Sequence, residues 1–421
     1  MRILLTSSAS HLPPRGGSTR GNLAWLEHLS HNGHSCCVVG GAPPAHSAEA
    51  WARIRRELQE EGLEPPAGAS ADLYRGIRIY SASKPEAQAA LLREQITAFH
   101  PDWILVSSED LSHVLLKEAQ RHAPGRIIYL AHTPQFFPFG PASWNADANA
   151  TGIVARAAGV IAIGNYMAEY IHLHCGRRPA VIHPPIYGEP PFPIKVQFAN
   201  GAITMINPSA VKGISIFLAL ADAFPNERFA ALPGWGTTEN DRADLRARAN
   251  ITLLPNCQNI DEVFQKTRIL LMPSLWLEGF GLVVVEAMLR GVPVIASNSG
   301  GLREAKFGTG FIAPVRQIDR YEPEFDDQGM PAAVIPQQDM TPWHEALSTL
   351  TGDSAAYDHE AELSRNIALK FVAGLSASHF ESFLANLTVV PEAAATVTSG
   401  NARGLSPERR ALLLRRLRKH S

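Results

Sequence analysis

The chain has 421 residues, which exceeds what one hydrophobic core usually supports, so its length favours two domains. Its formal net charge is −2 and 19% of its residues are charged, which excludes the overall basic excess typical of nucleic-acid-binding proteins. The hydrophobic share of 45% is ordinary for a globular protein, and no stretch approaches the ~20 apolar residues of a membrane span. The opening MRILLTSS has too short an apolar run for a signal peptide, so we expect a cytoplasmic protein.

Short β-branched runs alternate with helical patterns along the chain, which is typical of parallel sheets connected by crossover helices. In the first half these runs are MRILLTSS, SCCVVGG, GIRIYSA, WILVSS, RIIYLAHT, GVIAIG and AVIHPP. Residues 43–70 interrupt the pattern, and we expect an insertion with one charged helix there. The cysteines lack the paired spacing of a zinc site or a disulfide framework, so we predict reduced thiols at Cys36, Cys37, Cys175 and Cys257.

A proline-rich stretch at residues 183–195 is the best candidate for a linker, because proline disfavours regular structure. The strand pattern then restarts with ITMIN, RFAALPGW, NITLLPN, RILLMPS, VPVIAS and TGFIAP. We therefore predict domains at residues 1–187 and 188–364, with a helix near residues 365–387 completing the first. Residues 388–404 are expected to form a flexible linker, and residues 405–421 a basic amphipathic helix.

The segment that indicates chemistry is MPSLWLEGFGLVVVEAMLRGVPVIASNSGG, residues 272–301. Gly279 and Gly281 let the backbone approach a ligand, and a helix beginning near Leu282 directs unpaired N–H groups and its positive dipole end at a phosphate. Glu286 then lies about one turn inside the helix, up to ~12 Å from Glu278 in the turn. One carboxylate can bind a sugar and the other a ribose, with a diphosphate between them.

This segment resembles glycosyltransferase family 4. The resemblance includes the two glutamates seven residues apart, PSLWLEGFG, the following EAMLRGVPVIAS and the GG before Glu304. It implies the GT-B fold, in which two Rossmann-like, doubly wound parallel-sheet domains face each other across a cleft. It also implies that residues 1–187 form the acceptor-binding domain and residues 188–364 the nucleotide-sugar-binding domain. It further implies a retaining transfer of a hexose-type sugar from a nucleotide-diphosphate sugar, UDP- or GDP-linked, to a hydroxyl of a small-molecule or glycan acceptor.

The resemblance assigns roles to individual residues of this segment. Glu286 is expected to hold the ribose hydroxyls, and Glu278 to contact the donor sugar. The backbone of Gly279, Phe280, Gly281 and Leu282 is expected to line the sugar and phosphate site.

A second matching segment, INPSAVKG, corresponds to the family's phosphate-binding segment. Its lysine is Lys212, but the position of the usual arginine holds Asn207. Arg15, Arg20 or Arg303 are the candidates to supply the missing charge, although each is more easily read as a surface arginine.

In the N-terminal half, Gly16 and Gly17 match the family's glycine loop near the donor phosphates. His132, at the end of the strand RIIYLAHT, matches a histidine that contacts the donor sugar near the reacting carbon. The resemblance thus implies His132, Glu278 and Lys212 as the catalytic set. Aromatic residues after His132 are read either as an acceptor wall or as core or lid packing: Phe136, Phe137, Phe139 and Trp144.

No metal site is visible, because no D-x-D follows a strand and the histidines are scattered. Family resemblance agrees, since GT-B enzymes generally stabilise the leaving diphosphate with helix dipoles and cations. The C-terminal LSPERRALLLRRL resembles leader and linker helices of nonribosomal peptide and polyketide synthases, which favours docking to a synthase and a natural-product acceptor. Chance similarity and a membrane-surface helix are the alternatives.

Two other classes of function compete with the glycosyltransferase. A non-catalytic partner protein with a decayed site is suggested by Asn207 but opposed by the presence of Glu278, Glu286, Lys212 and His132. A dinucleotide-dependent oxidoreductase is opposed because the first strand is not followed by G-x-G-x-x-G.

Overall fold

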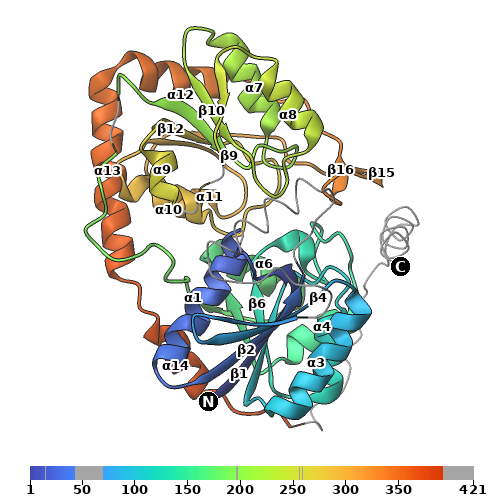
Figure 1. The fold of residues 1–421 in the computed structure, drawn as a ribbon. Helices are drawn as coiled ribbons and strands as arrows, with labels where there is room; N and C mark the ends of the chain where they lie inside the picture. The colour runs from blue at the N-terminus through green and yellow to red at the C-terminus, as the bar shows by residue number, and fades with distance from the viewer. Residues whose placement is uncertain (15, 43–69, 196–197, 256, 258, 392–421) are drawn as a thin grey trace. The chain divides into compact units, whose positions relative to one another are not determined.

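The structure is a computed structural model, and it describes residues 1–14, 16–42, 70–195, 198–255, 257 and 259–391. The chain divides into two compact units (Figure 1). The first comprises Met1–Ile186 together with the chain from Ser376 onward, and the second comprises Tyr187–Leu375. The charged helix expected within the insertion and the basic tail lie outside the described residues, whereas Ser70, at the end of the expected insertion, begins a strand.

The first unit is built on an eight-stranded sheet in the order β3-β4-β2-β1-β5-β6-β7-β8. All neighbouring strands are parallel except β3 and β4, which are antiparallel. Its strands are β1 (Arg2–Ser10), β2 (Ser35–Gly41), β3 (Ser70–Tyr74), β4 (Ile77–Ala82), β5 (Trp103–Ser107), β6 (Ile127–Ala131), β7 (Gly159–Ala162) and β8 (Ala180–Val181). Its helices are α1 (Gly17–His31), α3 (Pro85–Phe99), α4 (Val114–His122), η1 (Pro134–Phe136), α5 (Ala148–Arg156), α6 (Asn165–Cys175) and α14 (Ser378–Ala385).

The second unit contains a six-stranded, all-parallel sheet in the order β11-β10-β9-β12-β13-β14. The strands of this sheet and of an added antiparallel hairpin are β9 (Ala202–Ile206), β10 (Phe229–Leu232), β11 (Ile251–Leu253), β12 (Thr267–Met272), β13 (Val294–Ser297), β14 (Ile312–Ala313), β15 (Tyr321–Phe325) and β16 (Pro331–Ala333). Its helices are α7 (Ile214–Ala223), α8 (Glu239–Arg246), α9 (Ile260–Phe264), α10 (Leu282–Leu289), α11 (Leu302–Ala305), α12 (Thr341–Gly352) and α13 (Ser354–Ala373).

Each doubly wound sheet follows from the sequence pattern. The central strands are continuous runs of buried apolar residues, as expected for parallel strands covered on both faces. The predicted α/β architecture of two Rossmann-like sheets is therefore confirmed. The short strands β3, β15 and β16 were not predicted, because all three lie outside the buried parallel strands and lack a long apolar run.

The last two helices of the described chain, α13 and α14, belong to different units. The second domain is predicted to end at residue 364, whereas α13 continues to Ala373 within the second unit. Its Tyr357 hydroxyl donates to the Arg268 carbonyl at 2.8 Å, and its Glu360 accepts from the buried Lys306 ammonium at 2.9 Å. The following α14 belongs to the first unit, where it lies beside α1 (Figure 1). Phe380 of α14 stacks on Trp25 of α1 with ring centroids 4.8 Å apart.

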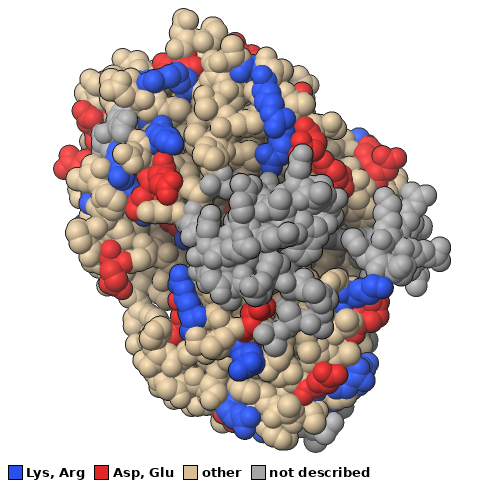
Figure 2. Space-filling model, viewed as in Figure 1, with Lys and Arg blue, Asp and Glu red and all other residues tan. Residues whose placement is uncertain are grey.

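Acidic and basic side chains lie interspersed on the face of the molecule drawn in Figure 2. Among the helices that the structure describes, none is long and apolar enough to cross a membrane.

Candidate functional site

The acidic turn that contains Glu278, between β12 and α10, packs against a second backbone segment, Gly300 and Gly301. Gly300 has a φ of 58°, and a Cβ at this position would lie 2.3 Å from the Glu278 carbonyl oxygen. The next residue, Gly301, donates its N–H to that same oxygen at 2.8 Å. Only glycine combines this φ with this approach, so the GG pair of the sequence motif fixes the backbone of Glu278.

The Glu278 carboxylate is the centre of a polar cluster. Its Oε1 accepts hydrogen bonds from the Lys212 ammonium at 2.6 Å, from the Trp276 indole at 3.1 Å and from the Ser274 hydroxyl. Burial raises the pKa of Glu278, but the Lys212 charge and these hydrogen bonds outweigh it, so the pKa lies below its ordinary value. Glu278 is therefore ionised at neutral pH, and no described residue donates to Oε2, which can accept from a ligand.

Lys212 lies between this carboxylate and two indole rings. Its ammonium is 4.5 Å from the ring centroid of Trp276 and 6.0 Å from that of Trp235. Both ion-pair partners are largely buried, with side-chain exposures of 15% for Lys212 and 12% for Glu278. Sequence reasoning paired Lys212 and Glu278 in one donor site but did not single out Ser274, Trp276 or Trp235. The first two lie inside the quoted motif, so the motif itself could have indicated them.

Asn207 joins the loops that follow β9 and β10. It has a φ of 56°, and its side-chain oxygen accepts from the Gly236 N–H at 2.9 Å. Its buried Nδ2 has no hydrogen-bond partner among the described residues. Asn207 therefore offers an uncharged hydrogen-bond donor, its side-chain amide, at the position where the family pattern has a positively charged arginine. Of the candidate replacement cations, Arg303 is exposed in α11, Arg20 is half-buried in α1, and Arg15 lies outside the described residues.

Helix α10 begins immediately after Gly281, whose φ of 113° again requires glycine. No side chain caps the N-terminus of this helix, so side chains leave its first backbone N–H groups available to a ligand. Glu286 lies further along the same helix and is 3% exposed. Phe280 is 1% exposed and contacts Phe371 with centroids 5.8 Å apart, so only its backbone is available to a ligand.

In the first unit, His132 follows β6 and is held by α1. Its Nε2 is 2.9 Å from Oδ1 of Asn22, and its backbone N–H donates to the Ser108 hydroxyl at 3.0 Å. Burial lowers the pKa of His132, with Glu109 opposing the shift. A neutral ring that donates from Nε2 to an amide oxygen leaves Nδ1 as the hydrogen-bond acceptor. Sequence reasoning did not indicate Asn22, because its partner lies 110 positions away.

The glycine loop lies at the start of the same helix. Gly16 is the N-cap residue of α1 with a φ of 80°, no side chain caps this end, and Gly17 is the first helical residue. As at α10, an uncapped N-terminus presents N–H groups and a positive dipole end.

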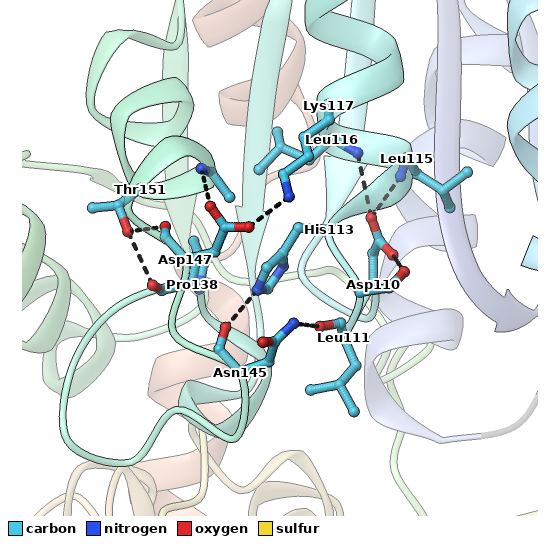
Figure 3. Close-up of polar contacts among 12 residues, drawn as sticks. Asp110, Leu111, His113, Leu115, Leu116, Lys117, Pro138, Asn145, Asp147 and Thr151 are labelled. Atoms are coloured by element: carbon cyan, nitrogen blue, oxygen red, sulfur yellow. Dashed lines mark hydrogen bonds and ion pairs between the residues drawn. The ribbon is translucent and has the colours of Figure 1, made fainter. Parts of the chain in front are cut away.

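A polar network anchors the loop after His132 to α4 and α5 (Figure 3). The His113 ring bonds the Asn145 carbonyl at 2.8 Å, and the Asn145 amide donates to the Leu111 carbonyl at 2.8 Å. Lys117 pairs with Asp147 at 2.5 Å, and Asp147 also caps α5. These contacts tie the loop to both helices.

The aromatic side chains of this loop point mostly into the protein. Phe137, Phe139 and Trp144 are 0%, 4% and 7% exposed, and Phe136 makes an edge contact with Trp144 at 5.4 Å. Of the two readings left open by the sequence, this geometry favours packing over an open acceptor wall.

The described part of the chain contains no group of three or more His, Cys, Asp or Glu residues able to hold a metal ion.

Two family descriptions match the sequence. The description of glycosyltransferase family 4 matches residues 15–187, and that of group 1 glycosyl transferases matches residues 236–327. An uncharacterised 42.6 kDa protein in the cps region of Klebsiella pneumoniae is 31% identical over 121 residues, which are 28% of this chain and 32% of that protein. The match thus spans about a third of that curated relative, and 11% of a second.

Solved structures share the two-unit architecture. HepE from Anabaena, in complex with UDP and glucose, has a TM-score of 0.60 at 18% identity, covering 91% of this chain and 100% of that one. Sucrose-phosphate synthase from Thermosynechococcus elongatus has a TM-score of 0.63 at 14% identity, covering 91% and 99%. The two parallel sheets and these likenesses define a GT-B protein. The chain belongs to glycosyltransferase family 4, among the group 1 glycosyl transferases.

Proposed function

We propose that this protein transfers a hexose from a UDP- or GDP-linked sugar to an acceptor hydroxyl, with retention of the anomeric configuration and without a metal ion. The observation that carries the proposal is the ion pair of Lys212 with Glu278 at 2.6 Å, in the turn that leads into the uncapped N-terminus of α10. Such a turn combines a fixed carboxylate for sugar hydroxyls with a cation and N–H groups for a diphosphate.

The donor is proposed to lie along this turn. Glu278 accepts from sugar hydroxyls through Oε2, and Glu286 accepts from the ribose. The diphosphate meets the Lys212 ammonium, the Asn207 amide and the backbone from Gly279 to Leu282. HepE, which has the same fold, binds UDP and glucose, and this supports a nucleotide-sugar donor.

In the proposed mechanism, no side chain acts as a general base toward the acceptor hydroxyl. The acceptor oxygen attacks the anomeric carbon from the face that the diphosphate leaves. The bond from that carbon to the phosphate oxygen breaks, and the departing phosphate oxygen takes the hydroxyl proton. Lys212 and the helix N-terminus stabilise the negative charge that develops on the diphosphate.

His132 is proposed to contact the donor sugar near the reacting carbon, and the Gly16 and Gly17 backbone to approach the phosphates. A neutral His132 suits this role, since its low pKa keeps an acceptor nitrogen available for a sugar hydroxyl. The acceptor is proposed to be a glycan or a peptide or polyketide natural product, with the tail beyond residue 404 docking to a synthase.

A thermal-shift panel tests the class of ligand. We expect stabilisation by nucleotide diphosphates and nucleotide sugars and none by NAD, because the pocket groups match a diphosphate linked to one ribose and one hexose. Stabilisation by NAD alone would contradict the proposal, and no response to any nucleotide would favour the non-catalytic alternative.

A further inference from the structure

Four side chains of the first unit form a continuous line of hydrogen bonds, which we call the Glu109–His132 network. The Ser107 hydroxyl donates to Oε2 of Glu109, and Nδ2 of Asn22 donates to the Ser107 oxygen at 3.2 Å. Oδ1 of Asn22 lies 2.9 Å from Nε2 of His132. The network thus connects a carboxylate to the histidine that we propose contacts the donor sugar.

Several elements of the first unit position these groups. Ser107 ends β5, His132 follows β6, and Asn22 belongs to α1. The backbone of Glu109 is bonded to β1, since its carbonyl accepts the Ser8 N–H at 2.9 Å. The fold, rather than proximity in the sequence, brings the members of the network together.

The inner members of the network are buried. Asn22, Ser107 and His132 are 1%, 0% and 3% exposed, whereas Glu109 is half-buried at the outer end. Buried donors and acceptors that lose a partner cannot turn to water instead, so each donor must face an acceptor. This requirement restricts the directions in which the hydrogens of the network can point.

The Glu109 carboxylate sets that direction. A carboxylate only accepts hydrogen bonds, so the Ser107 hydrogen points to Glu109 and the Ser107 oxygen is left to accept. Asn22 then turns its NH2 group to Ser107 and its carbonyl oxygen to His132. This oxygen requires a proton on Nε2, which leaves Nδ1 of His132 as the acceptor nitrogen.

The reverse direction would place the histidine proton on Nδ1. If Asn22 turned its NH2 group to His132, the Asn22 oxygen would take the Ser107 hydrogen. The Ser107 oxygen would then face the Glu109 carboxylate with no hydrogen between them. Loss of a hydrogen bond to a charged group changes an equilibrium by about tenfold or more, so the carboxylate favours one tautomer of the ring.

Glu109 acts on the position of the ring proton more than on the charge of the ring. Burial lowers the pKa of His132, and the opposing effect of Glu109 is the smaller of the two. The ring therefore stays neutral at neutral pH. No described residue forms a hydrogen bond with Nδ1 of His132, so this nitrogen can accept from a ligand.

We infer that Glu109 is a positioning residue, which acts through Ser107 and Asn22 to hold His132 in the tautomer whose Nδ1 accepts from a hydroxyl of the donor sugar. The contact with the sugar rests on the proposed function. The tautomer is a property of the protein without substrate, so it can be measured independently of activity.

NMR of the full-length protein, with histidine labelled by a nitrogen isotope, reports which ring nitrogen of His132 carries the proton, and His132→Asn identifies its signals. At mildly alkaline pH, we expect the wild type to carry the proton on Nε2. Glu109→Gln should populate both tautomers, because an amide can donate to Ser107 as well as accept from it. A proton on Nδ1 in the wild type, or an unchanged single tautomer in Glu109→Gln, would overturn the inference.

Two further variants separate the network from a general structural effect. Glu94→Gln is the matched control, since Glu94 is exposed in α3, and it should show the wild-type tautomer. Asn22→Asp places a group that only accepts beside Nε2, so the folded double variant Glu109→Gln/Asn22→Asp should regain the proton on Nε2. A mixture of tautomers that persists in the double variant would contradict the network as the cause.

Kinetics test the consequence for the reaction. In Glu109→Gln we expect kcat to fall severalfold while the affinity for UDP or GDP alone stays unchanged, because His132 is assigned to the sugar and not to the nucleotide. An altered tautomer with unchanged kcat would overturn the role of the network in catalysis. A wild-type protein that binds neither nucleotide would overturn the proposed function, and the tautomer measurement would still decide how Glu109 acts on His132.

Discussion

Replacing Lys212 by alanine tests the donor site most specifically. The substitution removes the ammonium that bonds Glu278 at 2.6 Å and that we propose meets the diphosphate. A hydrogen bond to a charged group contributes roughly 1.5 to 3 kcal/mol, and 1.36 kcal/mol corresponds to tenfold. We therefore expect kcat/KM for the donor to fall about 10- to 150-fold, with KM raised and kcat lowered, because the diphosphate gains charge as it leaves.

The assay measures initial rates of nucleotide diphosphate release over a range of donor concentrations. Lys370→Ala is the matched control, because Lys370 is an exposed lysine in the last turn of α13 and has no role in the proposed site. Circular dichroism verifies that both variants are folded. Kinetic constants in the Lys212 variant equal to those of the Lys370 control would refute the role assigned to this cation.

Three further predictions concern binding, acid stability and the core. Glu286→Ala is expected to weaken nucleotide binding by roughly 1.5 to 3 kcal/mol in calorimetry, through loss of a charge-assisted ribose contact; unchanged affinity would exclude that contact. The folded pKa of Glu278 lies below its ordinary value, so its stabilising contribution is present above the ordinary pKa and is lost as pH falls through the folded pKa. In denaturant titrations, the unfolding free energy of the wild type should fall more on acidification than that of Glu278→Gln. An equal fall in both proteins would contradict this. Lys306→Met leaves the buried Glu360 carboxylate without its cation and should lower the unfolding free energy by about 3 to 5 kcal/mol. Most of this loss should be recovered in the double variant Lys306→Met/Glu360→Leu. A loss below about 1 kcal/mol in the single variant would show that the pair is not coupled.

The sequence predicted the parallel sheets well because their strands are buried on both faces and read as apolar runs. Ile127–Ala131 and Thr267–Met272 are examples in which every residue is buried. The β15–β16 hairpin was missed for the opposite reason. Tyr321–Phe325 is acidic, contains a proline and has no buried residue, so its pairing depends on tertiary context.

For the site, the two short motifs INPSAVKG and PSLWLEGFG indicated residues that the structure brings together across 66 positions. Lys212 and Glu278 were assigned to one donor site, and the structure places them in contact. Sequence reasoning did not indicate Asn22, which holds His132 across 110 positions, because such a contact leaves no local pattern. The roles of the site residues toward a ligand stay predictions.

The anomeric configuration of the product tests the central claim most directly. The reaction is run with an α-linked nucleotide sugar and an accepted hydroxyl compound in the presence of a chelator, and the product is analysed by NMR. Front-face attack supported by Lys212 and the α10 N-terminus predicts an α-linked product and activity that survives the chelator. A β-linked product, or activity that disappears until a divalent ion is restored, would contradict the account.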